Sequence, residues 1–315
     1  MAGPTGDDVV VVVGGFNTSV DKFMEADAIA VGGVTRVRNV VAVPGGKGAH
    51  VALTAAALDE PVRLVGIIDG AHREWFTRFF SERGVEFDAV LVRGSIRTCV
   101  AIRDAVGVTT ELLEPGPMLE TAERDALMNR LLRVARDARV LVLSGSLPGG
   151  LSSGTYSEVI ASFRGSGVVV LVDGSGDVLR QAVAARPFLV KPNVDEAASL
   201  VGGDVHDLDS ALRAARAIEV DAAVVSLGAA GVAASWLDRA CHVAAPVLPE
   251  VRNVVGSGDC LVGGMAVALS RGGDADAALR LGVACGAANA LTTEAGLIRR
   301  SDVDALLPLV EVKWS

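Results

Sequence analysis

Short apolar runs alternate with helical stretches along most of this chain, and this alternation strongly limits its possible folds. The apolar runs are rich in β-branched residues, which is typical of strands that are buried on both faces of a sheet. Strands are predicted over residues 9–13, 62–68, 140–143, 168–172, 188–190 and 222–226, and helices over residues 47–58, 73–83, 120–137 and, with few breaks, 259–294. Such alternation indicates right-handed βαβ units, so we predict an α/β fold with a mostly parallel sheet flanked by helices on both faces.

Two stretches break this pattern. Residues 16–43 and 89–113 contain short segments in which apolar and polar residues alternate, as in half-exposed strands. We predict that they form a small β-sheet, a lid, which is inserted twice into a single domain of 315 residues. The free edge of such a sheet needs a cover, so pairing of two lids in a homodimer is expected.

The composition argues against several classes of protein. A net charge of −9 is unlike that of nucleic-acid-binding proteins, which normally carry a basic face, although it is compatible with a local basic pocket. The four cysteines are scattered without metal or redox spacing, which favours reduced, buried thiols in a cytoplasmic protein. Residues 1–8 are acidic, unlike a signal peptide, and glycine or charged residues interrupt the hydrophobic runs, so no membrane span is expected.

Residues 256–259 form the most informative motif, Gly-Ser-Gly-Asp, directly before an apolar helix. The first N–H groups of that helix have no partner within it, and together with the helix dipole they form an anion site. A carboxylate beside an anion site suits phosphoryl transfer, because Asp259 can take the proton of the attacking hydroxyl. An ordinary helix start with Asp259 near its cap is the alternative. Polar residues also follow several predicted strands, at the sheet edge where such folds bind ligands.

Five blocks of sequence, spread over nearly the whole chain, carry a resemblance to a known family. They are residues 17–21 (Asn-Thr-Ser-Val-Asp), 44–48 (Pro-Gly-Gly-Lys-Gly), 144–148 (Ser-Gly-Ser-Leu-Pro), 191–196 (Lys-Pro-Asn-Val-Asp-Glu) and 256–259. In this order they resemble the phosphofructokinase-B, or ribokinase-like, carbohydrate kinases, and most of all the 1-phosphofructokinase and tagatose-6-phosphate kinase branch. The resemblance implies a ribokinase-like fold and an ATP- and Mg²⁺-dependent kinase, expected to act on a ketohexose phosphate. A kinase for an unphosphorylated sugar or nucleoside and a non-catalytic sugar-phosphate-binding regulator are the alternatives.

The same resemblance implies roles for residues around the acceptor. Asp259 would be the catalytic base, beside an anion hole built from the main-chain amides of Gly256, Ser257 and Gly258. Asp21 would hold sugar hydroxyls, and the substrate loop would comprise Gly45, Gly46 and Lys47. The alternatives are a solvated carboxylate at the lid hinge for Asp21 and a surface lysine beside a tight turn for Lys47.

On the nucleotide side, the resemblance implies that Asn193 and Glu196 act on Mg²⁺ and phosphates largely through water, and that Lys191 approaches the phosphates. Asn193 and Glu196 also have the spacing of a helix capping box, which is compatible with a metal role. The nucleotide loop would be formed by Ser226, Gly228 and Gly231, unless these residues form a plain turn. Asn289, late in the last long helix, would lie near adenine or on a solvated helix face.

Two arginines bear on whether the acceptor already carries a phosphate. Arg97 and Arg36 occupy basic positions of the phosphosugar branch, and a guanidinium fork matches phosphate oxygens. Lys47 and Ser146 would complete the phosphate pocket. Ordinary arginines on the lid surface are the alternative.

The chain also departs from the branch at several positions. His50 stands where the branch usually has an Asn that contacts the sugar, so it is either a packed histidine or part of a changed sugar specificity. Asp69 lies in a loop that is usually richer in glycine, and it adds a charge near the substrate. The residues before Asp21 differ as well, so the sequence leaves the identity of the sugar open.

Overall fold

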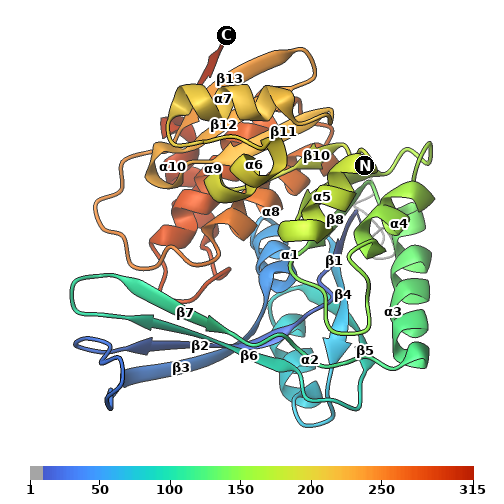
Figure 1. Ribbon diagram of the computed structural model, residues 1–315, viewed down its shortest axis with the longest axis vertical. Helices are drawn as coiled ribbons and strands as arrows, with labels where there is room; N and C mark the ends of the chain where they lie inside the picture. Colours follow the sequence, from blue (N-terminus) through green and yellow to red (C-terminus); the bar gives the residue numbers. More distant parts are fainter. Residues whose placement is uncertain (1–9) are drawn as a thin grey trace.

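The computed structural model describes residues 10–315, and within this range ten strands form one large sheet (Figure 1). The strands run in the order β14-β13-β12-β11-β10-β9-β8-β1-β4-β5, and those from β11 to β5 are parallel. The parallel strands are β1 (Val11–Gly14), β4 (Val62–Ile68), β5 (Val85–Leu91), β8 (Val140–Ser144), β9 (Val169–Asp173), β10 (Leu189–Val190) and β11 (Ala222–Ser226). The antiparallel edge consists of β12 (Val232–Trp236), β13 (Arg239–Ala244) and β14 (Glu311–Trp314). The predicted mostly parallel sheet is therefore confirmed; residue 9 of the first predicted strand and the acidic residues 1–8 lie outside the described residues.

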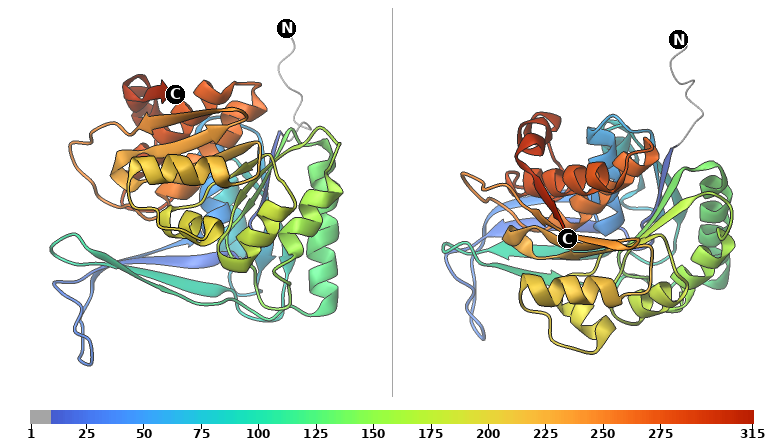
Figure 2. Two further views of the ribbon diagram at one scale, coloured as in Figure 1. Left: turned by 45° about the horizontal axis from the view of Figure 1, so that its top comes forward. Right: turned by 90° about the horizontal axis from the view of Figure 1, so that it is seen from above.

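Helices cover both faces of this sheet, as Figure 2 shows from above. One layer contains α1 (Lys47–Ala57), α8 (Ser257–Ser270), α9 (Ala275–Ala290) and α10 (Arg300–Leu306). The opposite layer contains α3 (Thr121–Val134), α4 (Thr155–Ser162), α5 (Gly176–Ala184), α6 (Val194–Val201) and α7 (Leu208–Ala217), and α2 (Arg73–Ser81) packs on the edge strand β5. Short 3-10 turns occur at η1 (Ala135–Asp137), η2 (Gly228–Ala230) and η3 (Leu307–Leu309).

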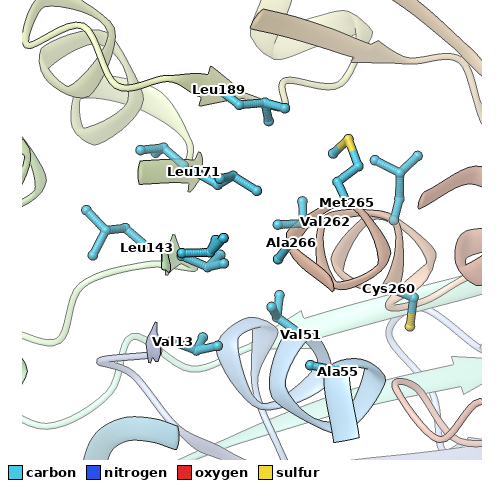
Figure 3. Close-up of a cluster of buried hydrophobic side chains, with 14 of the residues drawn as sticks. Val13, Val51, Ala55, Leu143, Leu171, Leu189, Cys260, Val262, Met265 and Ala266 are labelled. Atoms are coloured by element: carbon cyan, nitrogen blue, oxygen red, sulfur yellow. The ribbon is translucent and has the colours of Figure 1, made fainter. Parts of the chain in front are cut away.

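The core is built from small and aliphatic side chains, which explains how a chain with 4% aromatic residues can fill it. In Figure 3, Val13 of β1 and Leu171 of β9 point toward α1 and α8, whereas Leu143 of β8, which lies between these strands, points to the opposite face. Small residues let these two helices approach closely. A Cβ atom on Gly263 of α8 would stand only 2.7 Å from Cβ of Thr54 on α1. This close packing brings the first turns of α1 and α8 to the same side of the sheet.

The two stretches that broke the alternating pattern form a second, smaller sheet of order β3-β2-β6-β7, which projects from the body of the molecule (Figure 1). Its strands are β2 (Ser19–Glu25), β3 (Arg38–Gly45), β6 (Arg97–Arg103) and β7 (Thr109–Leu113). The sheet is mixed, because β2 and β6 run parallel while the outer pairs are antiparallel. The predicted small sheet is therefore present, but residues 89–91, expected within it, end β5 of the large sheet instead.

The register of the small sheet divides its side chains between two faces. Asp21 is paired with Cys99, which is paired with Leu113, so these three side chains share one face. Two residues along each strand, Ala101 and Glu111 lie on that same face. This arrangement directs one face of the small sheet toward the start of α1, since Asp21 contacts Gly46 and His50 there.

Two further expectations bear on the whole molecule. Over residues 10–315, no helix combines the length and the apolar character needed to cross a membrane. All four cysteines are free thiols, and three of them, Cys241, Cys260 and Cys285, are buried.

Candidate active site

The site is organised by the start of α8. Gly256 is the N-cap residue and has φ 83°, a left-handed conformation that glycine adopts without strain. The helix begins at Ser257, two residues before the predicted range of 259–294. Within the described part of the chain, the N–H groups of Gly256, Gly258 and Asp259 donate to no oxygen, whereas the N–H of Ser257 donates to the carbonyl oxygen of Val254 at 3.2 Å. The predicted anion site therefore has three unpaired N–H groups, but the amide of Ser257, which was expected to contribute, is engaged in the turn.

Asn289 holds this turn in place. Its Nδ2 donates to the Val255 carbonyl oxygen at 2.8 Å and to Oγ of Ser257 at 3.1 Å, and its Oδ1 accepts from the Gly296 N–H at 2.9 Å. The side chain is fully buried and does not line the neighbouring cavity. The alternative of a solvated helix face is therefore wrong, because the Asn289 side chain makes buried hydrogen bonds that shape the start of α8.

Two carboxylates meet at one histidine beside this helix start. Nδ1 of His50 lies 2.8 Å from Oδ2 of Asp259, and Nε2 of His50 lies 3.0 Å from Oδ2 of Asp21. Asp21 also accepts hydrogen bonds from Oγ of Ser19 at 2.6 Å and from the Gly46 N–H at 3.1 Å. All three side chains of the cluster are buried. Both ring nitrogens of His50 contact carboxylates of the protein, as expected for the alternative of a packed histidine. Asp21 is buried and is not the solvated carboxylate of its alternative.

The substrate loop is shaped by this cluster. Gly45 lies so close to the Asp21 carboxylate that any side chain at this position would overlap it, and Gly46 caps α1 with φ 101°. Because Gly45 and Gly46 have no side chains, the Asp21 carboxylate can lie directly against the main chain of this loop.

Electrostatic effects favour the charged forms of His50 and Asp21. Burial alone would lower the pKa of His50, but hydrogen bonds from its ring to Asp21 and Asp259, and the negative charges of both, raise that pKa to about 10. Burial would likewise raise the pKa of Asp21, but the hydrogen bond and the positive charge of His50 lower it below its ordinary value. A buried imidazolium between two carboxylates is the state that these shifts favour.

Asp173, at the end of β9, joins two lysines in the same region. Its carboxylate is fully buried and lies 3.2 Å from Nζ of Lys47 and 3.3 Å from Nζ of Lys191. Burial would raise the pKa of Asp173, but the charges of Lys191 and Lys47 lower it. Lys47 also lies 3.9 Å from Oδ1 of Asp259, and the nearby carboxylates raise its pKa against the effect of burial. The unfavourable position of Lys47 at a helix N-terminus is thus compensated by acidic partners.

Sequence reasoning noted Asp173 only as a polar residue that follows a strand and gave it no role. Its position after a buried strand was the available signal, whereas its two lysine partners come from distant parts of the chain.

A cavity of about 530 Å³ opens on the other side of the α8 start. Ser226, Gly228 and Gly231 line it together with Ser257 and Gly258, so the predicted nucleotide loop and the anion site share one pocket. Its remaining lining is mostly apolar and comes from residues 245–254 and from α8 and α9. A cavity of this size and character suits a small organic ligand. Nζ of Lys191 lies next to Gly258, at the boundary between the cavity and the acidic cluster.

Asn193 and Glu196 form the capping box that their spacing predicted. Asn193 Oδ1 accepts from the Glu196 N–H at 2.8 Å, and Glu196 Oε2 accepts from the Asn193 N–H at 2.9 Å. The negative charge of Glu196 nevertheless contributes to the raised pKa of Lys47, so this carboxylate lies on the same side of the molecule as the start of α1. Among the described residues, no group of three or more His, Cys, Asp or Glu side chains could hold a metal ion. Asn193 and Glu196 therefore fit Mg²⁺ only in a largely hydrated form.

Of the residues expected to grip a substrate phosphate, Arg36 lies apart from Arg97 and Ser146. Arg97 is buried and donates from Nε to the Asn17 carbonyl oxygen at 3.1 Å and from Nη1 to the Glu114 carbonyl oxygen at 3.4 Å. Ser146 accepts from Nδ2 of Asn17 at 3.0 Å, so Arg97 and Ser146 lie on either side of one residue. Arg36 is exposed in the β2–β3 connection, beyond the end of the hairpin that is farthest from Asp21, and is not brought to this cluster.

Asp69, which was expected to add a charge near the substrate, is engaged in hydrogen bonds within the protein. Its Oδ1 accepts from the main-chain N–H of His72 and its Oδ2 from that of Ile96, at 2.9 Å each. The carboxylate therefore fastens the start of α2 to the segment before β6.

Comparisons with known proteins agree with this geometry. Residues 8–300 match the model of the pfkB family carbohydrate kinases. A tagatose-6-phosphate kinase from Staphylococcus epidermidis is 30% identical over 302 residues, which are 94% of this chain and 97% of that protein. The structure of phosphofructokinase-2 from Escherichia coli in complex with fructose-6-phosphate superposes with a TM-score of 0.84 at 26% identity, covering 96% of this chain and 99% of that one. A possible 1-phosphofructokinase from Thermotoga maritima gives a TM-score of 0.87 at 21% identity, covering 97% and 99%.

The Asp173 pairing can be tested by stability. Replacing Asp173 by Asn leaves Lys191 buried without a carboxylate, so Asp173→Asn is expected to lower the free energy of unfolding by about 3 kcal/mol, as for a broken buried ion pair. Asp177, which pairs with Arg180 on the surface of α5, provides the matched control, and Asp177→Asn should change stability by less than about 1 kcal/mol. The measurement is urea-induced unfolding of both variants, and equal effects would contradict the role given to Asp173.

Proposed function

Because this chain belongs to the pfkB family of carbohydrate kinases, we propose that it transfers the γ-phosphate of ATP to a hydroxyl group of a ketohexose phosphate. The reaction would be of the 1-phosphofructokinase or tagatose-6-phosphate kinase type. One observation carries the proposal: the start of α8 presents unpaired N–H groups and Asp259 between a cavity of ligand size and an acidic cluster. ATP, the phosphoryl donor, and the acceptor sugar can thus approach the same helix end from opposite sides.

In this proposal, ATP occupies the cavity with its phosphates directed toward Gly258 and Lys191. The acceptor hydroxyl lies at Oδ1 of Asp259, the oxygen that His50 does not contact. Asp259 takes the hydroxyl proton as the oxygen attacks the γ-phosphorus. The free amides of Gly258 and Asp259, with Lys47 and Lys191, stabilise the charge on the moving phosphoryl group. Arrival of substrate under the small sheet would exclude water from these groups.

Mg²⁺ belongs to the same proposal. Asn193 and Glu196 would hold it largely through water, since a side-chain oxygen of each already accepts a hydrogen bond in the capping box. The ion would neutralise part of the phosphate charge of the bound nucleotide.

The free thiols and the absence of a membrane-spanning helix among residues 10–315 are consistent with the cytoplasmic location that we expect.

The role of Asp259 is tested by Asp259→Asn, which keeps the shape of the side chain and removes the base. We expect kcat to fall at least about 100-fold, the lower end of what general-base catalysis contributes. The assay is ADP release with Mg-ATP across free sugars, nucleosides and ketose phosphates. Asp195→Asn, on the first turn of α6, is the matched control and should stay within a few-fold of the wild type. Thermal stabilisation by a sugar phosphate without ADP release in the wild type would instead favour a non-catalytic binding protein.

A kinase for an unphosphorylated sugar is the second candidate, because the guanidinium of Arg97 already donates to two carbonyl oxygens and Arg36 lies away from the cluster. The variant Arg97→Lys separates the two. If Arg97 binds a substrate phosphate, KM for the ketose phosphate rises about tenfold or more while KM for ATP is unchanged. If both constants stay the same for the best acceptor, or if only free sugars are turned over, the second candidate is correct.

We also propose that two copies pair through their small sheets. The face opposite Asp21 carries apolar side chains that the chain leaves uncovered, among them Val40 and Leu112, which are 56% and 60% exposed. Burying such a face removes both its apolar surface and the free strand edges from water. A solved form of the Escherichia coli phosphofructokinase-2, 27% identical to this chain with a TM-score of 0.85 over 96% of this chain and 99% of that one, is a tetramer.

Leu112→Asp is expected to shift the protein from dimer to monomer, measured as molar mass by light scattering during size exclusion. Leu309, which is 59% exposed on η3 in the body of the molecule, provides the control Leu309→Asp, which should leave the mass unchanged. A monomeric wild type would refute the pairing.

A further inference from the structure

His50 connects three separate parts of the fold. It lies on α1, and its ring contacts Asp21 on β2 of the small sheet and Asp259 in the first turn of α8. The side chain is 6% exposed, as is that of Asp259, so water does not replace either contact. A ring with a carboxylate at each nitrogen is a link between the small sheet and the helix that carries the proposed base.

The number of protons on the two ring nitrogens of His50 follows from the geometry of these contacts. A neutral imidazole has one N–H donor and one acceptor nitrogen, so it can donate to only one of two ionised carboxylates. At 2.8 and 3.0 Å, the acceptor nitrogen would face the second carboxylate with no proton between them. An imidazolium donates at both nitrogens and makes both hydrogen bonds charge-assisted.

We infer that His50 is a positioning residue that, as an imidazolium, ties Asp259 to Asp21 and thereby couples the orientation of the base to the position of the small sheet. The inference deepens the proposed function, because it takes Asp259 to be the base of the kinase reaction. With Oδ2 of Asp259 bound to His50, its Oδ1 is turned toward Lys47 and the acceptor side. Movement of β2 relative to α8 would stretch or break one of the two hydrogen bonds of the ring.

Packing fixes the ring from a third side. A Cβ on Gly296 would stand 2.8 Å from Cα and from Cδ2 of His50, so the segment after α9 lies directly against the imidazole. The Gly296 N–H is bound by Asn289, which also holds Val255 and Ser257 of the anion site. The orientation of the base and the shape of the anion site therefore share one set of contacts.

The charged surroundings of the ring come from several elements. Asp259 on α8 and Asp21 on β2 contact the ring. Lys47 on α1 lies beside Asp259, and Cys99 on β6 is paired with Asp21. Glu111 on β7 shares the face of Asp21, and burial, followed by the negative charges of Asp259 and Asp21, raises its pKa. Acidic groups thus outnumber the cations near the ring, which favours the charged imidazolium. Because the pKa of His50 is raised to about 10, the link persists through neutral pH and is lost as the pH rises toward 10.

The protonation state can be measured without any turnover. The full-length chain contains four histidines, so the ring nitrogens of His50 are assignable in a ¹⁵N-labelled sample by comparison with His50→Gln. His72→Gln is the matched control, because His72 also contacts a carboxylate, that of Asp69 at 2.9 Å, but lies outside the cluster. We expect both ring nitrogens of His50 to be protonated at pH 8 in the wild type, and the titration to move to lower pH in Asp21→Asn. A neutral His50 ring at pH 8 would overturn the inference, whether or not the protein proves to be a kinase.

Kinetics then separate positioning from simple packing. The Asn side chain can place its amide nitrogen near the position of Nδ1 and so reach Asp259, whereas Gln reaches toward the position of Nε2 and Asp21. We therefore expect kcat to fall about 100-fold in His50→Gln, the scale of a misplaced reacting group, and less in His50→Asn, with KM for ATP unchanged in both. The decrease in kcat of the wild type toward pH 10 should be absent in His50→Asn. Equal losses in the two variants, with the alkaline decrease retained, would overturn the positioning role; unfolded variants would leave the spectroscopic test to decide.

Discussion

A buried carboxylate must be compensated by positive charge, and this requirement governs the region around the start of α8. Asp21, Asp173 and Asp259 are all buried, and ionising them without partners would be strongly unfavourable. His50 compensates Asp21 and Asp259, while Lys47 and Lys191 compensate Asp173. The partners come from β2, α1, β9, α8 and the end of β10, so satisfying these charges requires the large sheet, the small sheet and the helices to meet correctly.

The helical layer makes this meeting possible. Small residues at the contact of α1 and α8 bring both helix starts to one end of the sheet, where His50 and Asp259 are within hydrogen-bond distance. The same end carries the unpaired N–H groups and the cavity. Charge compensation and anion binding thus depend on the close packing of a core that contains few aromatic side chains.

Sequence patterns predicted six of the seven parallel strands, the helices α1, α2, α3, α8 and α9, the capping box at Asn193 and the gathering of polar residues at the strand ends, but not β5 or the antiparallel strands β12 to β14. These features depend on local periodicity or on the rule that ligands bind at the ends of parallel strands. The structural roles of Asn289, Asp69 and Asp173 could not be predicted in this way. Each is defined by hydrogen-bond or ion-pair partners that are distant in the sequence. For His50, the sequence identified the unusual residue, but only tertiary structure revealed that both ring nitrogens are used by carboxylates.

The central claim is that phosphoryl transfer takes place at the start of α8. A crystal structure with a non-hydrolysable ATP analogue, Mg²⁺ and the best acceptor sugar tests it most directly. The account predicts the terminal phosphate within hydrogen-bond distance of the Gly258 and Asp259 amides, with an acceptor hydroxyl at Oδ1 of Asp259. A nucleotide bound with its terminal phosphate away from this helix, or an acceptor whose hydroxyl does not approach Asp259, would contradict it.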